Sequence, residues 1–210
     1  EILRYPDVDE VTLVDLDPAV VELARSDDTF TRFNDGAFDD RRVEHIAADA
    51  FTWLREENTR TYDVVIADLP DPDDVSTSKL YTIEFYGLVD RALAADGRLV
   101  VQAGSPFFAP EAYWGIGESI AQAGFATTPY HVDVPSFGDW GYFLAATGEA
   151  PEVAVPADAP DDLRFLTPDV ARAALVFPPD RDRSSVGTVE PSSLLHPRVI
   201  DQQRGAWVGY

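Results

Sequence analysis

Cysteine, methionine and long apolar runs are absent from this chain of 210 residues. Without cysteine there are no disulfides, no thiolate metal ligands and no cysteine nucleophile, and this composition fits a reducing cytosol, so we expect a cytoplasmic protein. No apolar run approaches the roughly 18 residues that a membrane helix needs, and the first residues do not join a basic flank to an apolar stretch. The sequence therefore shows neither a membrane span nor a signal peptide.

Basic charge is also scarce. Lys79 is the only lysine, and the formal net charge is −22. Phosphate binding needs a basic footprint that this chain lacks, so we expect no nucleic-acid partner. An acidic surface of this kind is typical of halophilic proteins, which it keeps soluble, and it also suits a cationic substrate. The three histidines are scattered without metal-ligand spacing, so we predict no metal site.

The first residue bears on the extent of the chain. The chain begins with Glu1, although removal of an initiator methionine normally requires a small second residue. We therefore expect the sequence to start inside a longer protein.

Segments typical of strands alternate with segments typical of helices, which predicts an α/β fold with a mostly parallel sheet. Short apolar or β-branched runs predict the strands, apolar residues at helical spacing predict the helices, and the last two strands are expected to be antiparallel. Residues 80–97 read as one amphipathic helix with Gly97 as its C-terminal cap. The expected strands are 11–17, 43–47, 63–67, 98–105, 127–134 and 140–147, and the other expected helices are 18–26, from 50, and 110–124.

The composition changes near residue 148, where proline, alanine and acidic residues dominate. This change predicts a catalytic core at 1–147, a linker at 148–162 and an extension at 163–210 that packs on the core. Within the extension only residues 167–177 read as a helix, and the rest reads as loops.

Acidic and amide residues follow the predicted strands, at the edge where open α/β sheets bind ligands. Asp15 ends the first strand, where nucleotide-binding folds place an acid that accepts hydrogen bonds from both ribose hydroxyls. Asp49 follows the next strand, where its carboxylate can accept from an adenine amino group while the backbone N–H of Ala50 meets a ring nitrogen. Asp17 and Asp49 also fit helix N-caps, and that alternative stays open.

The stretch "YDVVIADLPDPDD" ends a strand in clustered charge. Asp68 and Asp71 flank Leu69-Pro70, whose proline stiffens the chain so that both acids can face one pocket. Like charges this close are costly unless a cation or a proton is shared, and a cationic amine meets that need. Asp73 and Asp74 read as solvated loop.

Six segments in register resemble the polyamine aminopropyltransferases, the spermidine synthases. They are "VTLVDLDPAVVELAR", "ADAFTWL", "YDVVIADLPDP", "LYTIEFYGLV", "LVVQAGSP" and "TTPYHVDVPSFGDWGYFLA". The segment "FFAPEAYWGI" is most similar to the branch often fused to an N-terminal membrane region. The resemblance covers roughly residues 1–180.

This resemblance implies a Rossmann-like fold of the methyltransferase type that moves an aminopropyl group from decarboxylated S-adenosylmethionine to a diamine such as putrescine, giving spermidine and methylthioadenosine. Decarboxylated S-adenosylmethionine would be a co-substrate, with no permanently bound cofactor. A homodimer and a membrane anchor in the full-length protein are left open.

The resemblance also implies roles for single residues. Asp15 matches the ribose-binding acid, and Asp49 with Ala50 the adenine site. Asp68 matches the acid that takes the proton from the attacking amine, and Asp71 its companion that holds substrate ammonium groups. Gln102 matches a pocket glutamine after the next strand. Phe137 stands where soluble members carry a substrate-contacting tyrosine, so the preferred amine stays open.

The chain departs from the family pattern, so other functions stay open. The glycine-rich cofactor loop, the strand before it and the N-terminal β-region of the family are not in this chain, so we expect the first strand of the fold to be missing. The alternatives are an S-adenosylmethionine-dependent methyltransferase and a non-catalytic binding module of the same fold. Amino-methylating enzymes commonly carry Asn/Asp-Pro-Pro-aromatic after the fourth strand, whereas "DLPDPDD" has two acids and no aromatic residue, which disfavours the first alternative.

Overall fold

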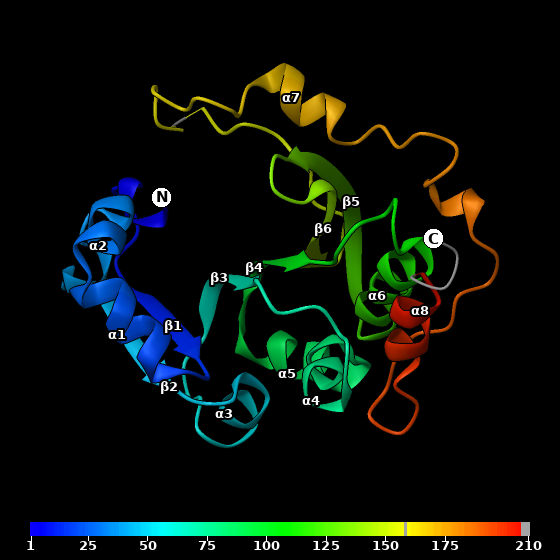
Figure 1. Cartoon of the computed structure of the whole chain (residues 1–210), viewed down its shortest axis with the longest axis horizontal. Helices are drawn as coiled ribbons and strands as arrows, with labels where there is room; N and C mark the ends of the chain where they lie inside the picture. Colours follow the sequence, from blue (N-terminus) through cyan, green and yellow to red (C-terminus); the bar gives the residue numbers. More distant parts are fainter. Residues whose placement is uncertain (158, 207–210) are drawn as a thin grey trace. The chain divides into compact units, whose positions relative to one another are not determined.

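The computed structural model describes residues 1–157 and 159–206. The chain divides into two compact units (Figure 1). The first unit comprises Glu1–Asn58 with Pro156–Arg164, and the second comprises Thr59–Val155 with Phe165–Tyr210, described as far as residue 206. The predicted division into core, linker and extension, with boundaries near 148 and 163, stays a prediction.

The first unit is built on a pair of parallel strands. Strand β1 pairs with β2 in a register that runs from Val11 opposite Val43 to Asp15 opposite Ala47. The elements of this unit are η1 (Ile2–Arg4), β1 (Val11–Asp15), α1 (Pro18–Ser26), α2 (Asp28–Asn34), η2 (Ala37–Asp39), β2 (Val43–Ala47) and α3 (Ala50–Glu56).

The second unit is built on a mixed sheet with the strand order β3-β4-β6-β5 among the described residues. Strands β3 and β4 are parallel, whereas β6 runs antiparallel to both β4 and β5, which confirms the predicted antiparallel pair. The elements are β3 (Tyr62–Ala67), α4 (Val75–Ser78), η3 (Lys79–Tyr81), α5 (Ile83–Ala92), β4 (Leu93–Gln102), α6 (Pro110–Gln122), β5 (Phe125–Val134), β6 (Gly138–Thr147), α7 (Pro168–Ala173), η4 (Arg183–Ser185) and α8 (Arg198–Ala206).

The core of this unit lies between the sheet and helices α5 and α6. Fully buried side chains come from β4 (Leu99, Val101), β6 (Phe143), α5 (Val89) and α6 (Ile120). Helix α6 approaches the sheet closely, because a Cβ at Gly117 would lie 2.6 Å from Cζ of Phe143. In Figure 1, α8 lies beside α6 on the side away from β3.

The predicted helix over 80–97 is wrong beyond Ala92. Residues 93–97 instead begin strand β4, whose first residue, Leu93, pairs with Tyr62. Gly97 is therefore not a helix cap. A Cβ at Gly97 would lie 3.0 Å from the carbonyl oxygen of Ala94 and 3.2 Å from that of Tyr62, so glycine permits a close approach of backbones.

The segment after β6, the tail, also differs from the prediction. Helix α7 falls within the predicted 167–177, and Thr167 caps it by accepting a hydrogen bond from the Val170 N–H. The prediction of loops beyond it is wrong at Arg198–Ala206, which forms α8 with Val199 and Ile200 buried. In the part of the chain that is described, no helix is both long and apolar enough to cross a bilayer.

Candidate active site

Asp15 and Asp49 come together at one edge of the first unit. Asp15 is the last residue of β1, Asp49 lies two residues after the adjacent parallel strand β2, and the N–H of Ala48 donates to the carbonyl oxygen of Asp15 at 3.0 Å. The Asp15 carboxylate accepts a hydrogen bond from the Asp17 N–H at 2.8 Å, which fixes the turn into α1. This edge is where the sequence places the ribose and adenine contacts.

The N-cap alternative is confirmed for Asp17 and Asp49. The Asp17 carboxylate accepts from the Ala19 N–H at 2.9 Å, and that of Asp49 accepts from the Thr52 N–H at 2.9 Å. Ala50 opens α3, in the first turn, where backbone N–H groups have no acceptor within their own helix. A nucleotide role for Asp15, Asp49 and Ala50 stays a prediction.

Asp68 directly follows β3 and is exposed. Tyr81 holds the loop that begins at Asp68, because its hydroxyl lies 3.1 Å from the carbonyl oxygen of Leu69 and 3.0 Å from that of Pro70. Burial, together with the charges of Asp71 and Asp68, raises the pKa of Tyr81, so its hydroxyl stays a proton donor. The loop is therefore anchored through its backbone, while the Asp68 side chain reaches solvent.

Asp71 lies deeper in the same loop and is half-buried. Burial raises the pKa of its carboxyl, and the charge of Asp73 adds to this effect, while a hydrogen bond from Gln102 opposes it. The Oε1 atom of Gln102 accepts from the Gly104 N–H at 2.9 Å, which leaves its amide nitrogen to donate to Asp71. Gln102 thus ties the end of β4 to the acidic loop.

The rest of the acidic loop serves a different purpose. Asp74 caps α4, because its carboxylate accepts from the N–H groups of Ser76 and Thr77 and the Thr77 hydroxyl completes a capping box. Asp74 is exposed and lies outside the helix, as predicted, and its role as an N-cap was not predicted. The clustered charge divides into a pair at 68 and 71 beside Gln102 and a helix cap at 74.

Two tyrosines that the sequence reading missed flank this cluster. Tyr142 of β6 pairs with Gln102, and Tyr130 of β5 pairs with Tyr142. The two tyrosine rings stack with their centroids 5.2 Å apart and their planes at 17°. Burial and the charge of Asp68 raise the pKa of Tyr142, and burial and Tyr142 raise that of Tyr130 to about 12. The alternation in "GYFLA" was a signal for a strand, but not for a site.

Phe137 lies in the turn between β5 and β6. The residue is 58% exposed, and its ring contacts that of Trp140 in a tilted arrangement, with centroids 5.1 Å apart and planes at 36°. Trp140 is two residues before Tyr142 on the same strand, so their side chains point to the same face of the sheet. A substrate contact of Phe137 stays a prediction.

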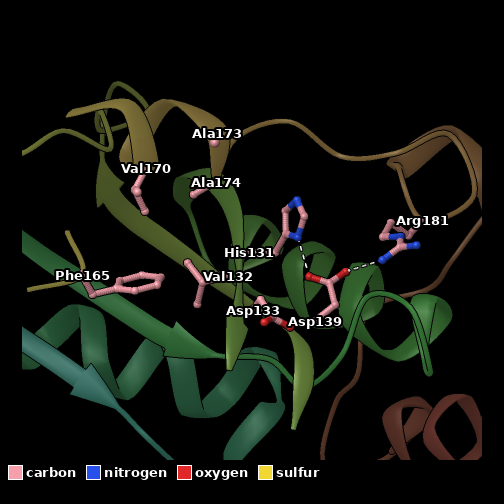
Figure 2. A pocket seen from close by; sticks show the side chains of 9 residues that line it. All are labelled: His131, Val132, Asp133, Asp139, Phe165, Val170, Ala173, Ala174 and Arg181. Carbon is pink, nitrogen blue, oxygen red and sulfur yellow. Dashed lines mark hydrogen bonds and ion pairs between the residues drawn. The ribbon is translucent and has the colours of Figure 1, made fainter. Parts of the chain in front are cut away.

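A cavity of about 380 Å³ lies elsewhere on the second unit, between β5, β6 and the tail (Figure 2). His131, Asp139 and Arg181 line it together with apolar side chains of β5 and α7. Asp139 joins the other two through its two carboxylate oxygens, at 2.5 Å to Nδ1 of His131 and 2.8 Å to Nη1 of Arg181. Asp68 and Asp71 are not among its lining residues.

Comparison with known proteins identifies the family of the chain. Residues 1–156 match the spermine/spermidine synthase domain family. The chain belongs to this family. Its fold is accordingly the Rossmann-like methyltransferase-type fold predicted from the sequence.

Curated relatives of the family match the whole chain. A polyamine aminopropyltransferase 1 of Streptomyces coelicolor is 50% identical over 211 residues, which cover 100% of this chain and 39% of that protein. A polyamine aminopropyltransferase of Mycobacterium tuberculosis is 47% identical, covering 99% of this chain and 39% of that protein. The chain thus spans about two fifths of the length of these relatives.

Solved structures agree. A spermidine synthase in complex with the transition-state analogue AdoDATO superposes with a TM-score of 0.71 and 26% identity, covering 85% of this chain and 61% of that one. The spermidine synthase of Thermotoga maritima gives a TM-score of 0.70 and 26% identity over 85% of this chain and 60% of that one.

Proposed function

We propose that the protein transfers an aminopropyl group from decarboxylated S-adenosylmethionine to a diamine such as putrescine, giving spermidine and methylthioadenosine. The observation that carries the proposal is the acid pair at the end of β3. Asp68 is exposed for proton exchange, and Asp71 is half-buried against Gln102 and raised in pKa. Membership of the spermine/spermidine synthase family and the curated relatives support the same reaction.

Asp68 is the base in this proposal. An alkylammonium must lose a proton before its nitrogen can attack, and a positioned carboxylate that accepts this proton typically contributes about 10²–10⁴-fold. The nitrogen then forms a bond to the aminopropyl carbon attached to sulfur, and the carbon–sulfur bond breaks with its electron pair going to the sulfonium. The leaving group is a neutral thioether, so no general acid is needed.

Asp71 and Gln102 hold the cationic substrate in this proposal. Ionisation of a carboxylate is unfavourable when it is partly buried without a cation, so burial raises the pKa of the half-buried Asp71, and an ammonium placed beside it restores its preference for the ionised form. The amide of Gln102 orients the carboxylate from the other side. Asp15, Asp49 and Ala50 would bind the adenosine portion, and Phe137 would line the amine site.

The decisive experiment changes Asp68 to Asn in the protein at its natural length. We expect turnover to fall by about a hundredfold or more, with the affinity for decarboxylated S-adenosylmethionine nearly unchanged. Asp73→Asn is the matched control, since it removes an exposed carboxylate from the same loop, and it should keep wild-type turnover. Turnover of Asp68→Asn within about twofold of wild type would remove Asp68 from the role of base.

Product analysis separates this reaction from methyl transfer, the main alternative. The protein is given decarboxylated or intact S-adenosylmethionine with putrescine, spermidine or agmatine as acceptor. We expect aminopropylated product from the decarboxylated form and no methylated amine from the intact form. Methylated product alone would refute the proposal, and no product from either form would favour a binding module. A cytoplasmic location, a homodimer, a membrane region and adaptation to salt stay predictions from the sequence.

A further inference from the structure

A row of side chains crosses the second unit at the level of the acidic loop. Gln102 on β4 pairs with Tyr142 on β6, and Tyr142 pairs with Tyr130 on β5. Side chains of directly paired residues point to the same face of a sheet. Asp68 follows Ala67, which pairs with Val101, so Asp68 leaves the sheet level with Gln102. The row is therefore Asp68, Gln102, Tyr142 and Tyr130.

The stacking of the two tyrosines shows which face of the Tyr142 ring is covered. Their centroids lie 5.2 Å apart with nearly parallel planes, a distance close to the spacing of about 4.8 Å between neighbouring strands. The rings thus stand beside one another along the line that joins the strands. Tyr130 covers the face directed toward β5, and the other face looks toward β4 and Gln102.

The acidic loop lies beyond β4, on the side toward which this second face of the Tyr142 ring is directed. Strands β6 and β3 are separated by β4, so their backbones are roughly 10 Å apart. Gln102 lies between them, with its amide turned to Gly104 and Asp71. The charge of Asp68 reaches the Tyr142 phenol and contributes to its raised pKa. An aromatic face and two carboxylates therefore flank one strip of the sheet.

This arrangement favours a cation between its two sides. The Tyr142 phenol stays neutral, since burial and Asp68 raise its pKa, and the face of a neutral phenol ring carries negative partial charge. An ammonium over that face gains a cation–π interaction while the carboxylates attract it from the opposite side. A neutral alkyl end would gain neither attraction.

We propose that Tyr142 is a specificity-determining residue for the acceptor, holding the ammonium that does not react against the face of its ring that is directed toward β4, above Gln102 and opposite Asp71, while Asp68 takes the proton from the nitrogen that reacts. This inference rests on the proposed function and deepens it. It predicts that the protein selects acceptors with a second protonated nitrogen, and that the Tyr142 ring, rather than its hydroxyl, makes part of that selection.

The test compares putrescine with n-butylamine, which has the same carbon chain but lacks the second ammonium, using the protein at its natural length. Tyr142→Ile removes the ring and suits a strand. We expect kcat/KM for putrescine to fall about tenfold, mainly through KM, as for the loss of a partly desolvated cation–π contact. The kcat/KM for n-butylamine should change by less than about twofold. Tyr142→Phe, which keeps the ring, and Tyr130→Phe, the matched control, should keep the wild-type preference.

The outcomes separate the two proposals. A wild-type protein that transfers no aminopropyl group to any amine overturns the proposed function and this inference with it. An active wild type whose preference for putrescine survives Tyr142→Ile overturns this inference alone. An equal loss in Tyr142→Phe overturns the role of the ring. If Tyr142→Ile does not unfold cooperatively, Tyr142→Gln, which also lacks a ring, replaces it with the same expectations.

Discussion

Removal of the charge on Asp139 tests what holds the tail to the sheet. The Asp139 side chain is 17% exposed and contacts Nδ1 of His131 on β5 at 2.5 Å and Nη1 of Arg181 in the tail at 2.8 Å. The Nε2 atom of His131 lies 3.0 Å from the carbonyl oxygen of Val176, also in the tail. One carboxylate therefore connects the β5–β6 hairpin to residues 176–181 on two routes.

We expect Asp139→Asn to lower the free energy of unfolding of the second unit by about 2 kcal/mol. The pair is only partly buried, so the loss should be near that of a hydrogen bond to a charged group, about 1.5–3 kcal/mol, and below that of a fully buried ion pair. The loss is limited further because Arg181 keeps a second carboxylate, Asp180, at 3.0 Å from its Nε. The change from carboxylate to amide also preserves the shape of the side chain, so no cavity adds to the cost.

Asp180→Asn is the matched control. It removes a carboxylate from the same guanidinium, but the Asp180 side chain is 59% exposed, and solvent screens exposed ion pairs, so we expect a much smaller loss of stability than for Asp139→Asn. Urea unfolding measures both variants, and hydrogen exchange of the His131 amide, which donates to the Ala174 carbonyl at 2.9 Å, reports on the junction itself. Equal losses of stability in both variants would refute a special stabilising role of the partly buried Asp139 carboxylate.

Three further predictions concern the packing of the second unit, and urea unfolding tests each of them. Because burial raises the pKa of Asp71, its carboxyl binds a proton more tightly in the folded state than in the unfolded state. The wild-type protein therefore loses stability as the pH rises from 3.8 through the raised pKa. Asp71→Asn should be more stable than wild type at pH 7 and lose this advantage in acid. Tyr86→Phe should stabilise by about 1 kcal/mol, because the buried Tyr86 hydroxyl has no hydrogen-bond partner among the described residues, and a loss of stability would show that the hydroxyl is paired. Gly141→Ala should lower the free energy of unfolding by about 1–3 kcal/mol, since its Cβ would lie 2.7 Å from Cδ2 of Tyr113. The control Gly87→Ala has open space at a helical position and should raise the free energy of unfolding by about 1 kcal/mol. Equal effects of the two substitutions would contradict the clash at Gly141.

Strands with a clear apolar pattern were predictable from the sequence. The run "VEHIA" gave the bounds of β2 as the structure has them, and the antiparallel pairing of β5 and β6 followed from their short connection. The segment "LAADG" after α5 was not predictable in the same way. Its residues favour helix, but Leu93 pairs with Tyr62 in the neighbouring strand, and this partner is 31 positions away in the sequence.

Helix α8 escaped prediction for a different reason. Its sequence "RVIDQQRGA" is mostly polar, and its apolar stripe is limited to Val199 and Ile200, with Gln203 buried beside them. Such a helix owes its stability to packing on α6 more than to its own pattern. Gly115 of α6 lies directly against the Gln202 side chain, so the match between the two helices depends on residues that are far apart in the sequence.

The residues of the candidate site also differ in how far the sequence alone predicts them. Asp68, Asp71 and Gln102 were found because ligand-binding residues of open α/β sheets follow the carboxyl ends of strands, which is a rule about position in the chain. Tyr142 and Tyr130 obey no such rule, because a tyrosine in an alternating strand reads as core or surface. Only the register, which sets Tyr142 beside Gln102 and Tyr130 beside Tyr142, brings an aromatic ring to the acids. The acids that carry the proposed chemistry are thus predictable from where strands end, whereas residues that select among amines depend on strand pairing and can change without altering any motif.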